Sequence, residues 1–129
     1  MAFISFIREK FDFTGDNIVV QGSDWYRVLT VRNSSGAALD MSEWAGTPPK
    51  CDFRNNNIPD GGVTTDMPQP TCSWLNGGSG GEIQVYISNG DSSAASVFEG
   101  VFSIEITHSS AQIAEVYYGN WEMTKETTL

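Results

Sequence analysis

The chain has 129 residues, of which 40% are hydrophobic and 18% charged, and its formal net charge is −9. A chain of this length forms one domain with a real core, and its apolar content excludes a disordered, highly charged protein. No apolar stretch approaches the ~20 residues that cross a bilayer. No run of basic residues offers the positive patch that nucleic acids and anionic membranes bind. We therefore expect a globular domain with no nucleic-acid or membrane partner.

The beginning of the chain is unusually apolar for a terminus. Its large apolar residues are Phe3, Ile4, Phe6, Ile7, Phe11 and Phe13. Two interpretations are open: an additional strand that covers the core, or an arm that docks on another subunit, because ordered apolar termini need a surface to be buried against. We treat residues 1–16 as an N-terminal arm and residues 17–129 as the main domain. The short apolar run, which no basic residue precedes, is not a secretory signal, so we expect assembly in a cytoplasm.

The first convincing strand follows a short apolar run at residues 17–20 and a turn at residues 21–24. It spans residues 25–32 and ends at the turn-forming residues 33–36. Its two faces carry Trp25, Leu29 and Val31 on one side and Tyr26, Val28 and Thr30 on the other. Arg27 falls on the first, apolar face. We therefore expect Arg27 to have a partner or to lie at a sheet edge.

Two short strands at residues 50–54 and 71–75 carry the cysteines. Alternation places Cys51 with Phe53, and Cys72 with Trp74, on the inner faces. Neither cysteine belongs to a CxxC or Cys/His cluster, which argues against a zinc site. We favour two buried reduced thiols on neighbouring strands over a disulfide.

The second half alternates more clearly, with strands expected at residues 82–88, 101–108, 111–118 and 121–125 and a helical turn at Ala94–Ala95. The residues that we expect to face inward are Ile83, Val85, Ile87, Phe102, Ile104, Ile106, Trp121 and Met123. About seven to nine short strands separated by turns predict an all-β fold. Its architecture is expected to be an antiparallel β-sandwich, Ig-like or jelly-roll-like.

Residues suited to catalysis or metal binding do not converge in the sequence. His108 adjoins Ser109 and Ser110 in a hairpin turn, where neighbours point in different directions, so we expect a solvent-exposed turn and not a hydrolytic triad. Asp60 and Asp66 could offer oxygen ligands to calcium, but their spacing departs from an EF-hand loop. We predict that the protein is not an enzyme and has no metal or cofactor.

Three aromatic residues near loops or at outward positions, Trp44, Trp74 and Tyr86, are candidates for a surface that stacks on sugars. Large aromatic residues also dominate cores of this size. Packing in the core or at a subunit interface is therefore favoured, and a carbohydrate platform is the alternative.

Five short motifs occur in a familiar order: residues 21–27 (QGSDWYR), residues 36–44 leading to 51–54, residues 80–85, residues 100–106 after a small-residue segment, and residues 119–127. In this order the sequence resembles the small β-sandwich domain at the N-terminus of many phage baseplate and tail-fibre proteins, the upper-baseplate-protein N-terminal type. The resemblance covers about residues 17–128. Pro48–Pro49, the longer N-terminal arm and the missing fibre region depart from it.

This resemblance implies a virion structural protein that attaches or connects tail components and carries no catalytic residues. We expect a tail, baseplate or tail-fibre adaptor, assembled in the host cytoplasm, whose partners are other virion proteins. Ring assemblies use closed symmetry, so a trimer or hexamer is expected. Two alternatives are a carbohydrate-binding module for a host-surface glycan and a capsid decoration (cement) protein.

Overall fold

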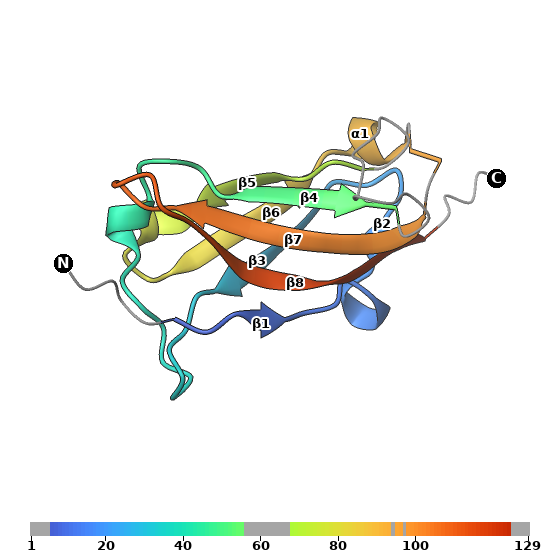
Figure 1. Cartoon of the computed structure of the whole chain (residues 1–129). Coiled ribbons are helices and arrows are strands. Elements are labelled where there is room, and N and C mark those ends of the chain that lie inside the picture. The colour runs from blue at the N-terminus through green and yellow to red at the C-terminus, as the bar shows by residue number, and fades with distance from the viewer. Residues whose placement is uncertain (1–5, 56–67, 94, 97, 125–129) are drawn as a thin grey trace.

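The protein is a β-sandwich of two sheets, as predicted from the alternation of its residues (Figure 1). The computed structural model describes residues 6–55, 68–93, 95–96 and 98–124. Phe3, Ile4, Ala94 and the pair Asp60 and Asp66 lie outside the described residues. Within the described part, no helix has the length and apolar character needed to span a membrane.

The larger sheet has five strands. They are β1 (Glu9–Lys10), β2 (Val19–Val20), β4 (Lys50–Arg54), β7 (Glu99–Thr107) and β8 (Ile113–Thr124). Strands β4, β7 and β8 are antiparallel neighbours, whereas β1 and β2 both pair with β8 in parallel. The sandwich is therefore antiparallel throughout except where the N-terminal strands join it.

The smaller sheet has three antiparallel strands in the order β3-β6-β5. They are β3 (Trp25–Thr30), β5 (Thr71–Trp74) and β6 (Glu82–Ile87). Short 3-10 turns occur at Gly15–Asn17, Ser42–Trp44 and Leu75–Gly78. An α-helical turn, α1, spans Asn89–Ser93, which is earlier in the chain than the turn predicted at Ala94–Ala95.

Aromatic rings from both sheets meet in the centre of the core. The ring of Phe13 lies 4.5 Å from that of Phe102, 5.2 Å from that of Trp25 and 5.9 Å from that of Phe53. Trp121 stacks on Phe53 at 4.9 Å. The inward residues predicted from alternation on β6, β7 and the end of β8 are all buried, which confirms that part of the analysis.

The break predicted at Gly119–Asn120 is wrong, because β8 runs through it without interruption. The backbone of Phe11 runs beside β8 so closely that a Cβ atom on Gly119 would lie 1.9 Å from the Phe11 carbonyl oxygen. Gly119 therefore permits a close approach of two strands and does not make a turn.

The two cysteines are buried free thiols that belong to different sheets. Cys51 lies on β4 and Cys72 on β5, the edge strands that face each other along one side of the sandwich. Burial raises the pKa of the Cys51 thiol well above its usual range, and the neighbouring Cys72 thiol raises it further. This side of the sandwich, which we call the closed seam, is thus sealed by a pair of buried thiols.

Candidate functional site

The described part of the N-terminal arm lies on the protein's own core. The amide of Phe11 donates to the Tyr118 carbonyl and that of Phe13 to the Asn120 carbonyl, both on β8. Phe13 is completely buried, and Phe6, Ile7 and Phe11 are half-buried. These residues follow the first of the two predicted interpretations, an additional strand over the core. Phe13 is therefore not available to another subunit.

The three aromatic candidates lie in different environments. Trp44 is only 2% exposed, which agrees with core packing, the favoured interpretation, and rules this residue out as a candidate surface aromatic. The 3-10 turn that contains Trp44 directs its indole inward, against the rings of Phe6 and His108. Trp74 is half-buried, with its indole N–H donating to the Thr47 carbonyl at 3.2 Å. Tyr86 alone lies on the surface, as predicted.

Tyr86 has an aromatic neighbour that sequence reasoning did not pair with it. Tyr26 on β3 lies directly opposite Tyr86 on β6, and both are exposed on the outer face of the smaller sheet. The Tyr86 hydroxyl donates to Asp24 Oδ1, which also accepts the amide N–H of Asn89. The hydrogen bond to the Asp24 carboxylate raises the pKa of Tyr86.

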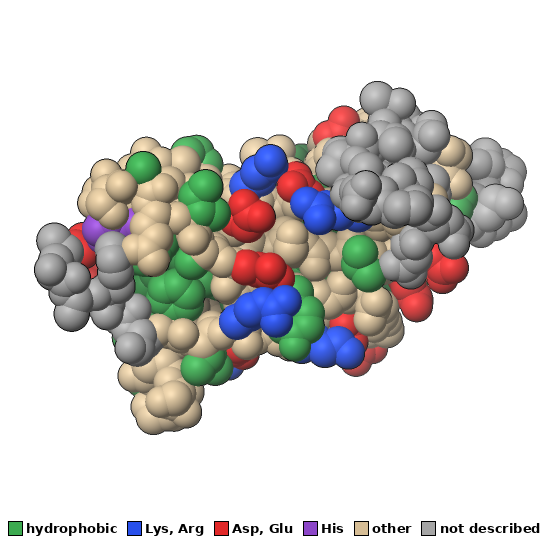
Figure 2. All heavy atoms as spheres, in the orientation of Figure 1, with side chains coloured by type: hydrophobic (Ala, Val, Ile, Leu, Met, Phe, Trp, Pro, Cys, Tyr) green, Lys and Arg blue, Asp and Glu red, His purple; other side chains and the backbone are tan. Residues whose placement is uncertain are grey.

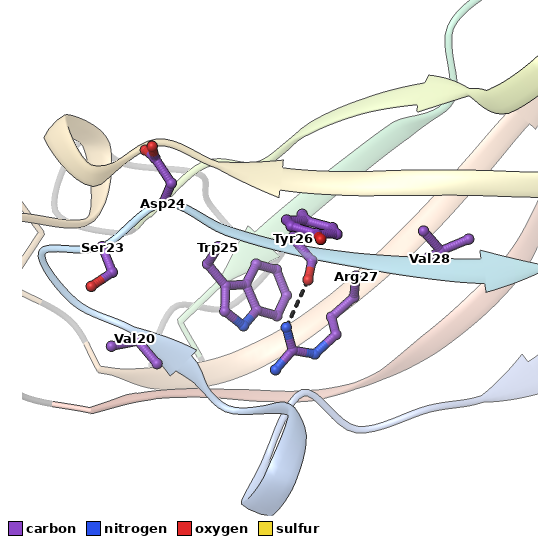
Figure 3. A pocket seen from close by; sticks show the side chains of 7 residues that line it. All are labelled: Val20, Ser23, Asp24, Trp25, Tyr26, Arg27 and Val28. Carbon is purple, nitrogen blue, oxygen red and sulfur yellow. Dashed lines mark hydrogen bonds between the residues drawn. The ribbon is translucent and has the colours of Figure 1, made fainter.

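A groove of about 550 Å³ runs along the outer edge of β3, beside this tyrosine pair (Figure 3). We define the β3 groove by the residues that line it, which are Val20, Ser23, Asp24, Trp25, Tyr26, Arg27 and Val28. Its apolar walls are unusually accessible, since Tyr26 is 59% exposed and Val20 and Val28 are each 41% exposed. Val20 on β2 lies across the groove from β3, so the groove occupies the second seam of the sandwich, the open seam.

The backbone along this edge of β3 is partly unpaired. The Val31 amide donates to the Gly81 carbonyl on the β6 side. Hydrogen-bonded residues alternate in an antiparallel pair, so the backbone groups of Tyr26, Val28 and Thr30 point to the open edge. Two of their carbonyls are occupied, that of Thr30 by the Tyr117 hydroxyl and that of Tyr26 by the Arg27 guanidinium. The N–H and C=O of Val28 have no partner among the described residues.

Arg27 has both the partners and the edge position that the sequence led us to expect. Its guanidinium donates to Asn17 Oδ1 at 3.2 Å, to the Asp16 carbonyl at 3.2 Å and to the Tyr26 carbonyl at 2.7 Å. All three acceptors are neutral, and within the described ranges no carboxylate forms an ion pair with Arg27. Arg27 is thus a cation that the fold holds in place without a counter-ion.

The indole of Trp25 lies beside this cation on the floor of the groove (Figure 3). Its ring centre is 5.1 Å from the Arg27 guanidinium carbon. The indole N–H is buried and has no acceptor in the described structure. Buried donors are nearly always satisfied, so an unpaired one beside an uncompensated cation indicates a place that suits an acceptor or an anion.

The prediction of a solvent-exposed turn at His108 is wrong for its side chain, which is 3% exposed. His108 Nδ1 lies 2.9 Å from Ser110 Oγ and accepts the Ser110 amide at 3.1 Å, and Nε2 lies 3.3 Å from Glu43 Oε2. The ring also packs edge-on against Trp44. The cluster ties the β7–β8 turn to the 3-10 turn at Ser42–Trp44. A local turn signal gives no indication of such a tertiary contact.

Comparisons with known proteins give no family assignment. No protein-family model matches the chain, and no curated protein or solved structure is significantly similar to it. Among the described residues, no three His, Cys, Asp or Glu side chains gather as they do around a metal ion. The β3 groove and the tyrosine pair are therefore the candidate binding surfaces of the described structure.

Proposed function

We propose that this protein is a structural component of a bacteriophage particle, a tail, baseplate or tail-fibre adaptor that acts by holding other protein chains. The observation that carries the proposal is the β3 groove. An edge strand with unpaired backbone groups and exposed apolar side chains is a surface to which another chain binds, and isolated proteins normally protect such edges. The order of the five motifs over residues 17–128 supports the phage setting.

The sandwich suits this role because its core is rigid while one seam stays accessible. Aromatic rings from both sheets interlock around Phe13, which fixes β3 relative to β4 and β7. Other virion proteins are the proposed partners, and repeated copies in a ring are proposed to form a trimer or hexamer.

The proposal is tested by locating the chain in purified particles. Immunogold electron microscopy with an antibody to this chain is expected to label the tail end. Label over the whole capsid surface would instead support a cement protein. Intact particles that contain none of this chain would contradict a virion role altogether.

A second candidate function, binding of a host-surface glycan, is favoured by the exposed tyrosine pair. Tyr26 and Tyr86 offer adjacent ring faces, and Asp24 at their edge offers a carboxylate that can accept hydrogen bonds from sugar hydroxyls. Glycan-array binding that Tyr86→Ala abolishes and Trp74→Ala leaves intact would establish this function. An array without any bound glycan would eliminate it.

A further inference from the structure

We infer that the β3 groove takes an extended segment of a partner chain as an added strand, and that Arg27 recognises one carboxylate on that segment. The inference rests on the proposed adaptor function and names the kind of partner that the groove fits. The partner segment is largely apolar at alternate positions, carries one acidic residue and is otherwise neutral or basic.

The backbone of the groove offers hydrogen-bonding groups to an added strand. The N–H and C=O of Val28 and the N–H of Tyr26 point to the open edge without partners in the described structure. An added strand binds through just such groups, and its main-chain hydrogen bonds supply affinity without regard to sequence. The site is short. Ile7 donates to the Arg32 carbonyl and Tyr117 to that of Thr30, so the edge beyond Val28 is already occupied.

The carbonyl of Tyr26 on this backbone is capped. Arg27 Nη1 donates to this carbonyl at 2.7 Å and so protects the edge when the groove is empty. A carboxylate on an incoming strand is a stronger acceptor for a guanidinium than a neutral carbonyl is. When Nη1 turns to that carboxylate, the Tyr26 carbonyl becomes free to accept an N–H from the added strand. One acidic residue on the segment thus frees the Tyr26 carbonyl and gives the Arg27 guanidinium a new acceptor.

The walls of the groove set the composition of the rest of the segment. Alternate side chains of an added strand point to opposite faces of the sheet. On one face they meet the exposed Tyr26 and Val28, and on the other the exposed Val20 and the wall formed by Trp25. Apolar residues therefore suit most positions. The chain carries a net charge of −9, so a segment with several acidic residues is repelled as a whole and only one is expected.

The inference is tested with a surface-display library of random short peptides, selected for binding to the full chain and counter-selected against Val28→Pro. Proline removes the Val28 N–H and is tolerated on edge strands, and circular dichroism establishes that the variant is folded. Selected peptides are expected to share alternating apolar residues and one Asp or Glu. Binding of a synthetic selected peptide is expected to weaken about tenfold with Arg27→Gln, as for loss of one charged hydrogen bond. The matched control Arg32→Gln, also a surface arginine, is expected to leave the affinity unchanged.

Amide hydrogen exchange provides the decisive readout. The selected peptide is expected to slow exchange at Tyr26 and Val28, and protection confined to other strands overturns the inference. Three other outcomes overturn the inference equally. The first is a selection that shows no enrichment over Val28→Pro, and the second is a set of selected peptides without an acidic residue. The third is binding of N-acetylneuraminic acid in place of any peptide. None of these outcomes removes the chain from purified particles, so failure of the strand-addition site is distinguishable from failure of the adaptor function.

Discussion

The two seams of the sandwich, where the edges of the two sheets face each other, are built differently. At the closed seam β4 and β5 lie close together over the buried thiols of Cys51 and Cys72. At the open seam β3 and β2 are separated by a groove of about 550 Å³ that contains Arg27, a cation that forms no ion pair with any described carboxylate. The outer face of the larger sheet resembles neither seam, because Figure 2 shows acidic and basic side chains interspersed across its middle. The contrast places the accessible groove at one of the two seams, along β3.

The largest effect is expected where the open seam is anchored to the core. Phe13→Ala removes a fully buried ring that packs against Trp25, the floor of the groove, and is expected to cost about 3–5 kcal/mol of unfolding free energy. Phe11→Ala, at a half-buried ring in the same segment, serves as the control and is expected to cost clearly less. Chemical denaturation measures both. Equal losses would show that Phe13 is not part of the core.

A smaller effect is expected at the closed seam. Cys72→Ser places a hydroxyl in a buried site beside a thiol, and burial of a poorly paired polar group is expected to cost about 1–3 kcal/mol. Ser23→Ala at the open seam is expected to change stability by no more than ~0.5 kcal/mol, since the serine is exposed. Urea unfolding of both variants compares the seams directly. A neutral Cys72→Ser would mean that the closed seam is as accessible as the open one.

The hydrogen bonds of Arg27, which cap the open edge, are expected to contribute still less to the free energy of unfolding. Arg27→Gln loses hydrogen bonds to three neutral acceptors and is expected to destabilise the protein by about 1 kcal/mol. It is also expected to raise the tendency to aggregate, because it uncovers the edge. Lys50→Gln, which removes an exposed ion pair with Asp52, is the control and is expected to have almost no effect. Light scattering during thermal unfolding measures aggregation, and equal scattering by the two variants would contradict the capping role.

The smallest expected effect is a loss of stability at alkaline pH, caused by Tyr117 at the end of the open seam. Burial, followed by the charge of Glu9, raises the pKa of Tyr117 above its usual value of 10.0. Because the folded state binds this proton more tightly, its stabilising contribution is complete below pH 10 and declines as the pH rises through the folded pKa. Unfolding followed between pH 9 and about 12 is expected to show this decline, and Tyr117→Phe is expected to reduce it. If Tyr117→Phe leaves the decline of stability with pH unchanged, the decline belongs to another group.

The sequence predicted the faces of the strands well because each strand of a two-layer sandwich buries one side. On β6 the buried Val85 is followed by the exposed Tyr86, and this alternation can be read from the sequence without any tertiary information. Gly119 shows where this reasoning ends. A glycine in a strand can indicate either a turn or a close approach of another backbone, and only the position of Phe11 decides between them.

The candidate site was less accessible to sequence reasoning, because it depends on which edges remain unpaired. Arg27 on an apolar face indicated a partner or a sheet edge, and the fold supplies both. The groove itself arises from the pairing of β3 with β6, far along the chain, and of β2 with β8. His108 was misplaced for the same reason, since its side chain is buried against Trp44, which is distant in sequence.

A high-resolution electron-microscopy map of the assembled particle tests the central claim most directly, because it shows what lies beside Val28. The account predicts a backbone segment of a neighbouring chain that continues the smaller sheet along β3, with an acidic side chain against Arg27. A map in which the edge of β3 faces solvent, while neighbours contact only the charged face of the larger sheet, would contradict it.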